Sequence, residues 1–518
     1  MKKLMKQLKK AAYKKMFSSQ QETTKKEITL EVSLAQNRHL IKNALGNSSD
    51  IIIRNLTVNG VQCSLVYIAD LADENKVQEY IVEPLIKNFN DKEHISLNWL
   101  SNKVASPKVR FEERLDEILQ SINAGQTVLL LEGETAALIL ETLDEQYRSV
   151  TMPPTELVVR GPHEGFIESI NKNVGMVRKR LKTPNFRVID KQLGLYTNTS
   201  INICYIDGIA KDEVVEEVKK RLDQIELDGV LESGYIEEFI EDAPFSPFPT
   251  IGITQKPDVV AAKLLEGRVA IFCDGTPAIM TVPFLFIENF QTADDYYNRP
   301  YFSSIFRLIR LISIFISFML PSLYVAIVNY HPDFLPTDFL MTIASASQGV
   351  PFPKVIEVLF MGLIFEILRE AGLRIPTPIG QTVSIVGALV LGEAAVGAGL
   401  VGQPVIIVTA LVAISSFAVN FSLTATLILM RLVFLMGGAV LGLFGVNVVF
   451  LALIIHLASI RSFGVNFLSP LAPMAVSSWK DTFLRLPWWL MGTRPTRLSE
   501  NPVRQKKIKQ PKQVIADD

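Results

Sequence analysis

The chain has 518 residues, of which 52 are Lys or Arg and 53 are Asp or Glu, so its formal net charge is −1. This balance argues against a nucleic-acid-binding protein, because such proteins are usually basic. The chain has three cysteines, too few for a secreted fold held together by disulfides. Each lies in an apolar, strand-like run, and we therefore expect Cys63, Cys204 and Cys273 to be core residues with free thiols.

The charged residues are distributed very unevenly along the chain. Residues 1–300 carry 79 of them, whereas residues 311–480 carry only 12. Between Ile375 and Met430 the single charged residue is Glu393. A water-soluble domain has no reason to avoid charge over such a length, so we predict a soluble front half and a membrane-embedded back half.

The first 26 residues form a basic tail, with seven lysines and no acidic residue among the first seventeen. No apolar run of the kind found in a secretory signal peptide follows them, so we expect the soluble half to stay in the cytosol. Two interpretations of the tail stay open. It is either an amphipathic segment on an anionic membrane surface or a solvated, disordered extension.

Helical and strand-like periods alternate in residues 27–148, which predicts an α/β module. We expect helices over 33–45, 74–88 and 111–122 and strands over 51–56 and 62–68. A hairpin over 127–131 and 136–140 would turn at Glu132-Gly133-Glu134.

Residues 149–300 repeat this theme. The segment GQTVLLLEGETAAL (125–138) matches GRVAIFCDGTPAIM (267–280) at an offset of 142 residues, and the contexts of Tyr67 and Tyr205 match at an offset of 138. Two anchors in the same order, with nearly equal spacing, predict a duplication into two similar modules.

The sequence offers no enzyme, and we expect no cofactor and no metal. The Glu-Gly and Asp-Gly pairs at Gly133 and Gly275 are better explained as hairpin turns than as acid pairs or phosphate loops. The five histidines are scattered without metal-ligand spacing, and nucleotide-binding and hydrolase motifs are missing. Residues 243–250 (APFSPFPT) contain three prolines, so they cannot form a helix and are predicted to be either an ordered extended segment or a linker.

We predict an all-α, polytopic membrane domain over residues 301–480 and a basic cytoplasmic tail over 481–518. The domain contains about six apolar segments, at residues 309–328, 355–368, 379–400, 404–419, 423–443 and 446–460. Their short connectors leave five or six spans open. Basic residues precede the first segment and follow the last, and the loop over 330–353 has none. The positive-inside rule then favours six crossings with both termini in the cytoplasm.

Charged residues within membrane segments are costly and are therefore functional candidates. Glu393 lies among glycines and alanines, where it would form a cation-attracting ring in an oligomer, or else would pair with Arg431 and hold two helices together. Glu357 and Glu366 are nine residues apart and face opposite sides of a helix, and Glu366 is alternatively an interfacial charge near Arg369. Two further polar residues, Gln381 and Ser384, would extend a polar pathway toward Glu393.

Three strings together resemble the A subunit of the GerA family of bacterial spore germinant receptors. They are PFSPFPTIGITQKPDVVAAKLLEGRVAIFCDGTPAIMTVPFLFIENFQTADDYY (244–297), RIPTPIGQTVSIVGALVLGEAAVGAGLVGQP (374–404) and VNFLSPLAPM (465–474). The resemblance runs from about residue 27 to about residue 497.

The resemblance implies a location in the spore inner membrane, with a large cytoplasmic region ahead of several spans. It implies assembly with a transporter-like B subunit that senses the nutrient, with a lipoprotein C subunit and with further copies of the chain. It also implies a ligand-gated channel for monovalent cations. Two alternatives stay open: a non-conducting scaffold of the receptor, or an A-like paralogue that amplifies ion release without sensing nutrients. A third, a secondary transporter with broken Pro/Gly helices, is disfavoured because the membrane segments contain no internal repeat.

Overall fold

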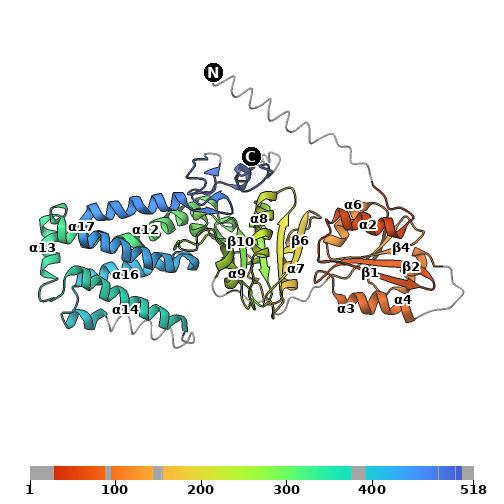
Figure 1. Ribbon diagram of the computed structural model, residues 1–518, viewed down its shortest axis with the longest axis horizontal. Coiled ribbons are helices and arrows are strands. Elements are labelled where there is room, and N and C mark those ends of the chain that lie inside the picture. Colours follow the sequence, from red (N-terminus) through yellow and green to blue (C-terminus); the bar gives the residue numbers. More distant parts are fainter. Residues whose placement is uncertain are drawn as a thin grey trace, which may run out of the picture.

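The computed structural model describes residues 28–87, 95–143, 153, 156–374, 392–475, 478–495 and 497–504. Figure 1 shows three bodies in a row, with a first β-sheet and its helices at one end, a helical half at the other, and a second β-sheet between them.

The first sheet has five antiparallel strands in the order β1-β2-β4-β5-β3. Successive residues of β2 and β4 point to opposite faces, and both faces are apolar and buried. Helices α2 and α6 cover one face, and the helical stretch α3–η1–α4 together with α5 covers the other. The elements are α2 (Leu34–Ala44), β1 (Ile51–Val58), β2 (Val61–Ile68), α3 (Glu74–Lys76), the π-helical turn η1 (Val77–Val82), α4 (Glu83–Lys87), α5 (Leu97–Lys103), β3 (Val109–Glu112), α6 (Leu115–Asn123), β4 (Thr127–Leu131) and β5 (Ala137–Leu140).

The second sheet has the strand order β6-β7-β9-β10-β8, which reproduces the order of the first sheet position by position. Helices α7 and α10 cover one face, and α8 and α9 cover the other. The elements are α7 (Ile170–Arg180), β6 (Phe186–Leu193), β7 (Thr199–Ile206), α8 (Asp212–Asp223), α9 (Ser233–Ile240), β8 (Gly252–Thr254), α10 (Pro257–Leu265), β9 (Val269–Cys273), β10 (Ile279–Val282), η2 (Phe286–Phe290) and α11 (Asp294–Tyr297).

Most elements expected for the α/β half are found. The hairpin between β4 and β5 turns at Gly133, whose positive φ of 90° suits glycine, and all three cysteines are buried with free thiols. The helix expected over 111–122 is wrong at its start, because Phe111 and Glu112 belong to β3, which pairs with β5. The proline-rich residues 243–250 form no helix or strand, as expected.

A buried arginine joins the two sheets. The guanidinium of Arg178 on α7 is 1% exposed and donates to Asp50, with 2.8 Å between Nη2 and Oδ1. It also donates to Ser48 and Asn123 of the first sheet's layers and lies over the ring of Phe186. A charge so deeply buried needs every one of these partners, so the two sheets are held in one relative position at this point.

The helical half comprises α12 (Pro300–Tyr330), η3 (Pro332–Phe334), α13 (Thr337–Ser345), α14 (Lys354–Arg374), α16 (Gln403–Phe417), η4 (Phe421–Leu423) and α17 (Thr424–Ser459). Among the described residues, α12 and α17 are long and apolar enough to cross a membrane, and α16 is apolar but shorter. Helices thus occur at five of the six apolar segments named above, and residues 392–397 of the remaining one are also helical. The segment over 379–400 lies largely outside the described residues, and the number of spans stays a prediction.

Helix α17 folds back on itself at Gly442 (φ 61°, ψ −143°). A straight helix of 36 residues would be about 54 Å long. Yet Thr426, near its start, donates to the carbonyl of Pro247, and His456, near its end, is 2.9 Å from the hydroxyl of Ser246. Both ends therefore lie against the same proline-rich loop, and α17 is a helical hairpin of two antiparallel arms.

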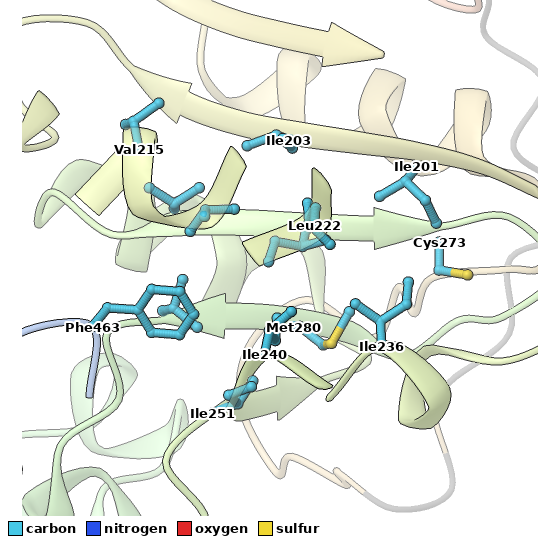
Figure 2. Close-up of a cluster of buried hydrophobic side chains, with 14 of the residues drawn as sticks. Ile201, Ile203, Val215, Leu222, Ile236, Ile240, Ile251, Cys273, Met280 and Phe463 are labelled. Carbon is cyan, nitrogen blue, oxygen red and sulfur yellow. The ribbon is translucent and has the colours of Figure 1, made fainter. Parts of the chain in front are cut away.

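The chain after α17 returns to the second sheet. Residues 461–466 form a two-stranded ribbon of β11 (Arg461–Ser462) and β12 (Val465–Asn466). The hydroxyl of Ser462 donates to Thr250 and accepts from the backbone N–H of Phe284. Figure 2 shows the ring of Phe463 among Ile240, Ile251 and Met280, inside the core of the second sheet. A residue from beyond the helical half thus completes this core.

Candidate functional site

The strongest cluster of charged side chains in the helical half is built around a proline in α12. Pro321 has no backbone N–H, so the carbonyl of Ser317, four residues earlier, loses its helical partner. The Nε of Arg431 on α17 donates to this carbonyl at 3.0 Å. Arg431 is 7% exposed. The arginine therefore supplies the donor that the proline removes.

The other side of the same guanidinium faces α14. Its Nη1 lies 2.9 Å from Oε1 of Glu366, whose second oxygen lies 2.6 Å from Arg369. Three helices thus share one charged network, formed by the Ser317 carbonyl, Glu366 and Arg369, and Arg431. The alternative that paired Arg431 with Glu393 named the wrong acid, because the carboxylate within reach of the guanidinium is that of Glu366.

Glu357 is a second acid of α14 and is more deeply buried than Glu366. It is 1% exposed, and its two oxygens lie 2.6 Å from Nζ of Lys354 and 2.8 Å from the backbone N–H of Gly402. Gly402 is the N-cap of α16, where free N–H groups favour a carboxylate. Glu357 therefore ties α14 to the start of α16, while Glu366 ties it to α17.

The remaining sequence candidates are placed differently. Glu393 lies in a helical stretch over 392–397 and is exposed in the single chain. Gln381 and Ser384 lie outside the described residues. The structure thus brings Glu366 and Arg431 together and places Glu357 separately.

A second charged network lies where α12 meets the α/β half. Arg307 is buried and forms ion pairs at 2.8 Å with Asp295 and with Asp481, which follows the last helix. Burial raises the pKa of Asp481, and Arg307 opposes that effect. From the sequence, Arg307 is identified only as one of the basic residues that precede the first apolar segment. Its partners are 12 and 174 residues away, and no local pattern indicates them.

The returning chain forms one more buried cluster on the second sheet. Arg268 pairs with Glu288 at 2.9 Å and with Glu266, which also pairs with Arg504 at 2.7 Å. Burial acts to raise the pKa of Glu266, but Arg268 and Arg504 outweigh it and hold the pKa below its ordinary value. This cluster fastens the C-terminal segment to the second sheet.

A shallow cavity of about 270 Å³ lies at the foot of the α17 hairpin. Its lining includes Pro247, Thr426 and three acids of the α9 region, Glu237, Glu238 and Glu241. Burial raises the pKa of Glu237 to about 7, with a further contribution from the carboxylate of Glu241. The cavity is thus a carboxylate-lined recess beside the first turn of a membrane-type helix.

Comparison with known proteins decides the family. A model of the Bacillus/Clostridium GerA spore germination protein matches residues 39–497. The chain belongs to the GerA family. The resemblance inferred from the three sequence strings is thereby confirmed.

Two relatives match most of this chain, and a solved structure matches about half of it. Spore germination protein KA of Bacillus subtilis (strain 168) is 40% identical over 95% of this chain and 91% of its own length. The uncharacterized membrane protein YfkQ of the same organism is 41% identical over 86% of this chain and 88% of its own. The crystal structure of the N-terminal domain of the A subunit of the Bacillus megaterium spore germinant receptor GerK3 is 37% identical. The match covers 51% of this chain and 99% of the chain in the crystal structure, with a TM-score of 0.41.

Proposed function

We propose that this GerA-family chain is the A subunit of a nutrient-responsive germination receptor in the spore inner membrane, and that several copies form a ligand-gated channel for monovalent cations. Membership of a spore germination family supports the first part. The observation that carries the second is the charged network of Glu366 and Arg431 inside an otherwise apolar set of helices. Charges at membrane depth cost about 2.5–3.5 kcal/mol each on insertion scales and commonly mark ion pathways.

Glu393 is our candidate for a ring of acids in the channel. Glu357 and Glu366 are engaged with Gly402 and Arg431 in the single chain, whereas Glu393 is exposed. In a ring of identical subunits an exposed acid recurs around the axis and attracts cations. Gln381 and Ser384 would continue the pathway toward it.

We further propose two duplicated cytoplasmic modules, residues 27–148 and 149–300, a membrane domain over 301–480 and a basic tail over 481–518. The identical strand orders of the two sheets support the duplication. The start of α12 contacts the α/β half through Arg307 and Asp295, and the segment after α17 contacts it through Asp481, which accepts from the hydroxyl of Tyr296. This return supports an even number of crossings, six by our sequence count, with both termini in the cytoplasm.

The receptor would contain a transporter-like B subunit that binds the nutrient and a lipoprotein C subunit. Nutrient can open the channel only if its bound state favours the open form of the complex. The end of the α/β half at α11 and the returning segment would carry that preference to α12, because Arg307 pairs with Asp295 of the one and Asp481 of the other.

Spores carrying Glu393→Gln test the channel. We expect potassium release after nutrient addition to slow markedly while immunoblots show normal levels of the chain. The matched control is Glu370→Gln, an exposed acid at the end of α14 that pairs with Arg374, and it should release potassium normally. Normal release from the Glu393 variant would remove that residue from the channel.

A non-conducting scaffold is the second candidate, as is an A-like paralogue that amplifies ion release without nutrient. The chain is 41% identical to YfkQ, whose name states only that it is an uncharacterized membrane protein, and this similarity is compatible with both alternatives. Potassium flux through the purified chain in liposomes would exclude the scaffold. Flux that does not require the B subunit and nutrient in spores would favour the paralogue.

A further inference from the structure

Residues 479–490 (WKDTFLRLPWWL), here called the interfacial segment, expose an unusual set of side chains. Three of the four tryptophans in the chain belong to it. Trp479, Trp488 and Trp489 are 41–46% exposed, and Leu484 and Leu490 are about half exposed. Tryptophan combines a large apolar ring with one N–H donor, and it is enriched where a membrane meets water.

The interfacial segment lies beside the first turns of α12. The backbone N–H of Arg485 donates to the hydroxyl of Ser304 at 3.0 Å. At the same level α12 exposes the aromatic and aliphatic side chains of Phe302, Ile305 and Phe306, each more than half exposed. The apolar surface of a membrane-type helix therefore continues onto the interfacial segment.

The interfacial segment is held in place by the buried charges below it. Asp481 pairs with Arg307, and the ring of Trp488 lies 5.9 Å from that of Tyr296. The guanidinium of Arg485 lies over Trp488. These contacts hold the backbone of the interfacial segment on its buried side. Binding through the exposed tryptophan and leucine side chains therefore costs little conformational entropy.

The outward charge at this level is positive. The carboxylates of Asp295 and Asp481 are engaged by arginines of α12. Lys480 and Arg299 form no ion pair with a carboxylate in the part of the chain that the structure describes, and Arg299 is exposed. A cationic rim beside apolar rings complements an anionic phospholipid headgroup above its acyl chain.

We propose that the interfacial segment lies in the headgroup layer of the membrane and binds anionic phospholipid. Trp479, Trp489 and Leu484 enter the boundary between headgroups and acyl chains, and Lys480 and Arg299 face the lipid phosphates. The proposal rests on α12 crossing the membrane as described under the proposed function.

The test uses the full chain in nanodiscs, with Trp99→Phe so that all remaining tryptophans belong to the interfacial segment. One set of discs contains phosphatidylcholine brominated near the headgroup, and another contains lipid brominated near the chain end. We expect the headgroup-proximal bromines to quench tryptophan emission more strongly, and phosphatidylglycerol to increase that quenching. Absence of quenching in both sets would overturn the proposal.

Variants in the same background separate lipid binding from other contacts. Lys480→Gln with Arg299→Gln should abolish the effect of phosphatidylglycerol, whereas the control Lys219→Gln on α8, far from α12, should retain it. If quenching seen with one copy per disc disappears with several copies, a second copy covers the segment and the lipid assignment is wrong. The readout is independent of conduction, because a chain that is quenched but passes no ions would contradict only the channel.

Discussion

The Nε of Arg431 donates a 3.0 Å hydrogen bond to the carbonyl of Ser317, which Pro321 has deprived of its helical donor. The same guanidinium neutralises Glu366 on α14. One side chain of α17 therefore contacts both α12, at its proline site, and α14. If these helices move relative to one another, the contacts of Arg431 with Ser317 and Glu366 have to break, or the helices have to move together.

Removing either member of the Arg431–Glu366 pair should strongly destabilise the helical half. Glu366→Gln leaves the buried guanidinium of Arg431 without its carboxylate, which costs about 3–5 kcal/mol. Arg431→Gln leaves Glu366 paired with Arg369 but removes the donor to the Ser317 carbonyl, so it should also destabilise the chain. The double variant should be less destabilised than the sum of the two, with a coupling of about 1–3 kcal/mol. Thermal unfolding of the chain in detergent ranks the stabilities of the two single variants and the double variant.

A surface pair on the same helix is the control. Arg374 and Glu370 are 79% and 59% exposed, so Arg374→Gln should change stability by no more than about 0.5 kcal/mol. Additive effects of Arg431→Gln and Glu366→Gln would mean that the pair is not energetically coupled.

The arms of α17 should tolerate no side chain at Gly445. A Cβ there would lie 2.0 Å from the carbonyl oxygen of Gly437, so Gly445→Val has to push the arms apart. We expect little folded protein on size-exclusion chromatography in detergent. Gly362→Ala in α14 is the control, since a Cβ at Gly362 meets no atom within 4 Å, and alanine favours helix by about 1 kcal/mol. Normal folding of the Gly445 variant would refute the hairpin.

Stability should depend on pH through Glu237. Because its pKa in the folded chain is raised to about 7, the folded state binds more protons than the unfolded state between the ordinary glutamate value and neutrality. Stability from this group is thus full at low pH and is lost as pH rises toward 7. Glu237→Gln should flatten the fall in Tm between pH 5 and pH 8, and Glu238→Gln, an exposed neighbour, should not. Parallel curves for the native chain and Glu237→Gln would contradict the assignment.

The junction of the two sheets should depend on Arg178. Arg178→Met leaves Asp50 without its guanidinium partner in a mostly buried position, at a cost of about 3 kcal/mol. We expect a lower Tm and faster amide hydrogen exchange in the first residues of β1 and at the end of α7. Lys219→Gln, which breaks an exposed pair with Glu216 on α8, should do neither. Unchanged exchange at both places would show that Arg178 does not join the sheets.

Local patterns predicted much of the fold. The apolar runs of β2 and β4, the turn at Gly133 and the apolar helices are properties of short windows. The partners of Arg431 and Arg307 were not predicted, because ion pairs form between residues that are far apart in the sequence and meet only in the tertiary structure. A pair between Glu393 and Arg431 is one of two interpretations that the sequence leaves open, whereas Glu366 is the acid that α14 brings next to Arg431. The missing N–H of Pro321 was the available signal that a donor would be needed in α12.

Phe463 lies in the core of the second sheet, although it is separated from that sheet's last strand by the entire helical half. During synthesis the second sheet therefore emerges long before the ring that fills its interior. A chain cut short within the helices leaves this core incomplete, whatever the quality of its sheet. Completion of this core therefore requires the chain to pass through the whole helical half and to return to the second sheet.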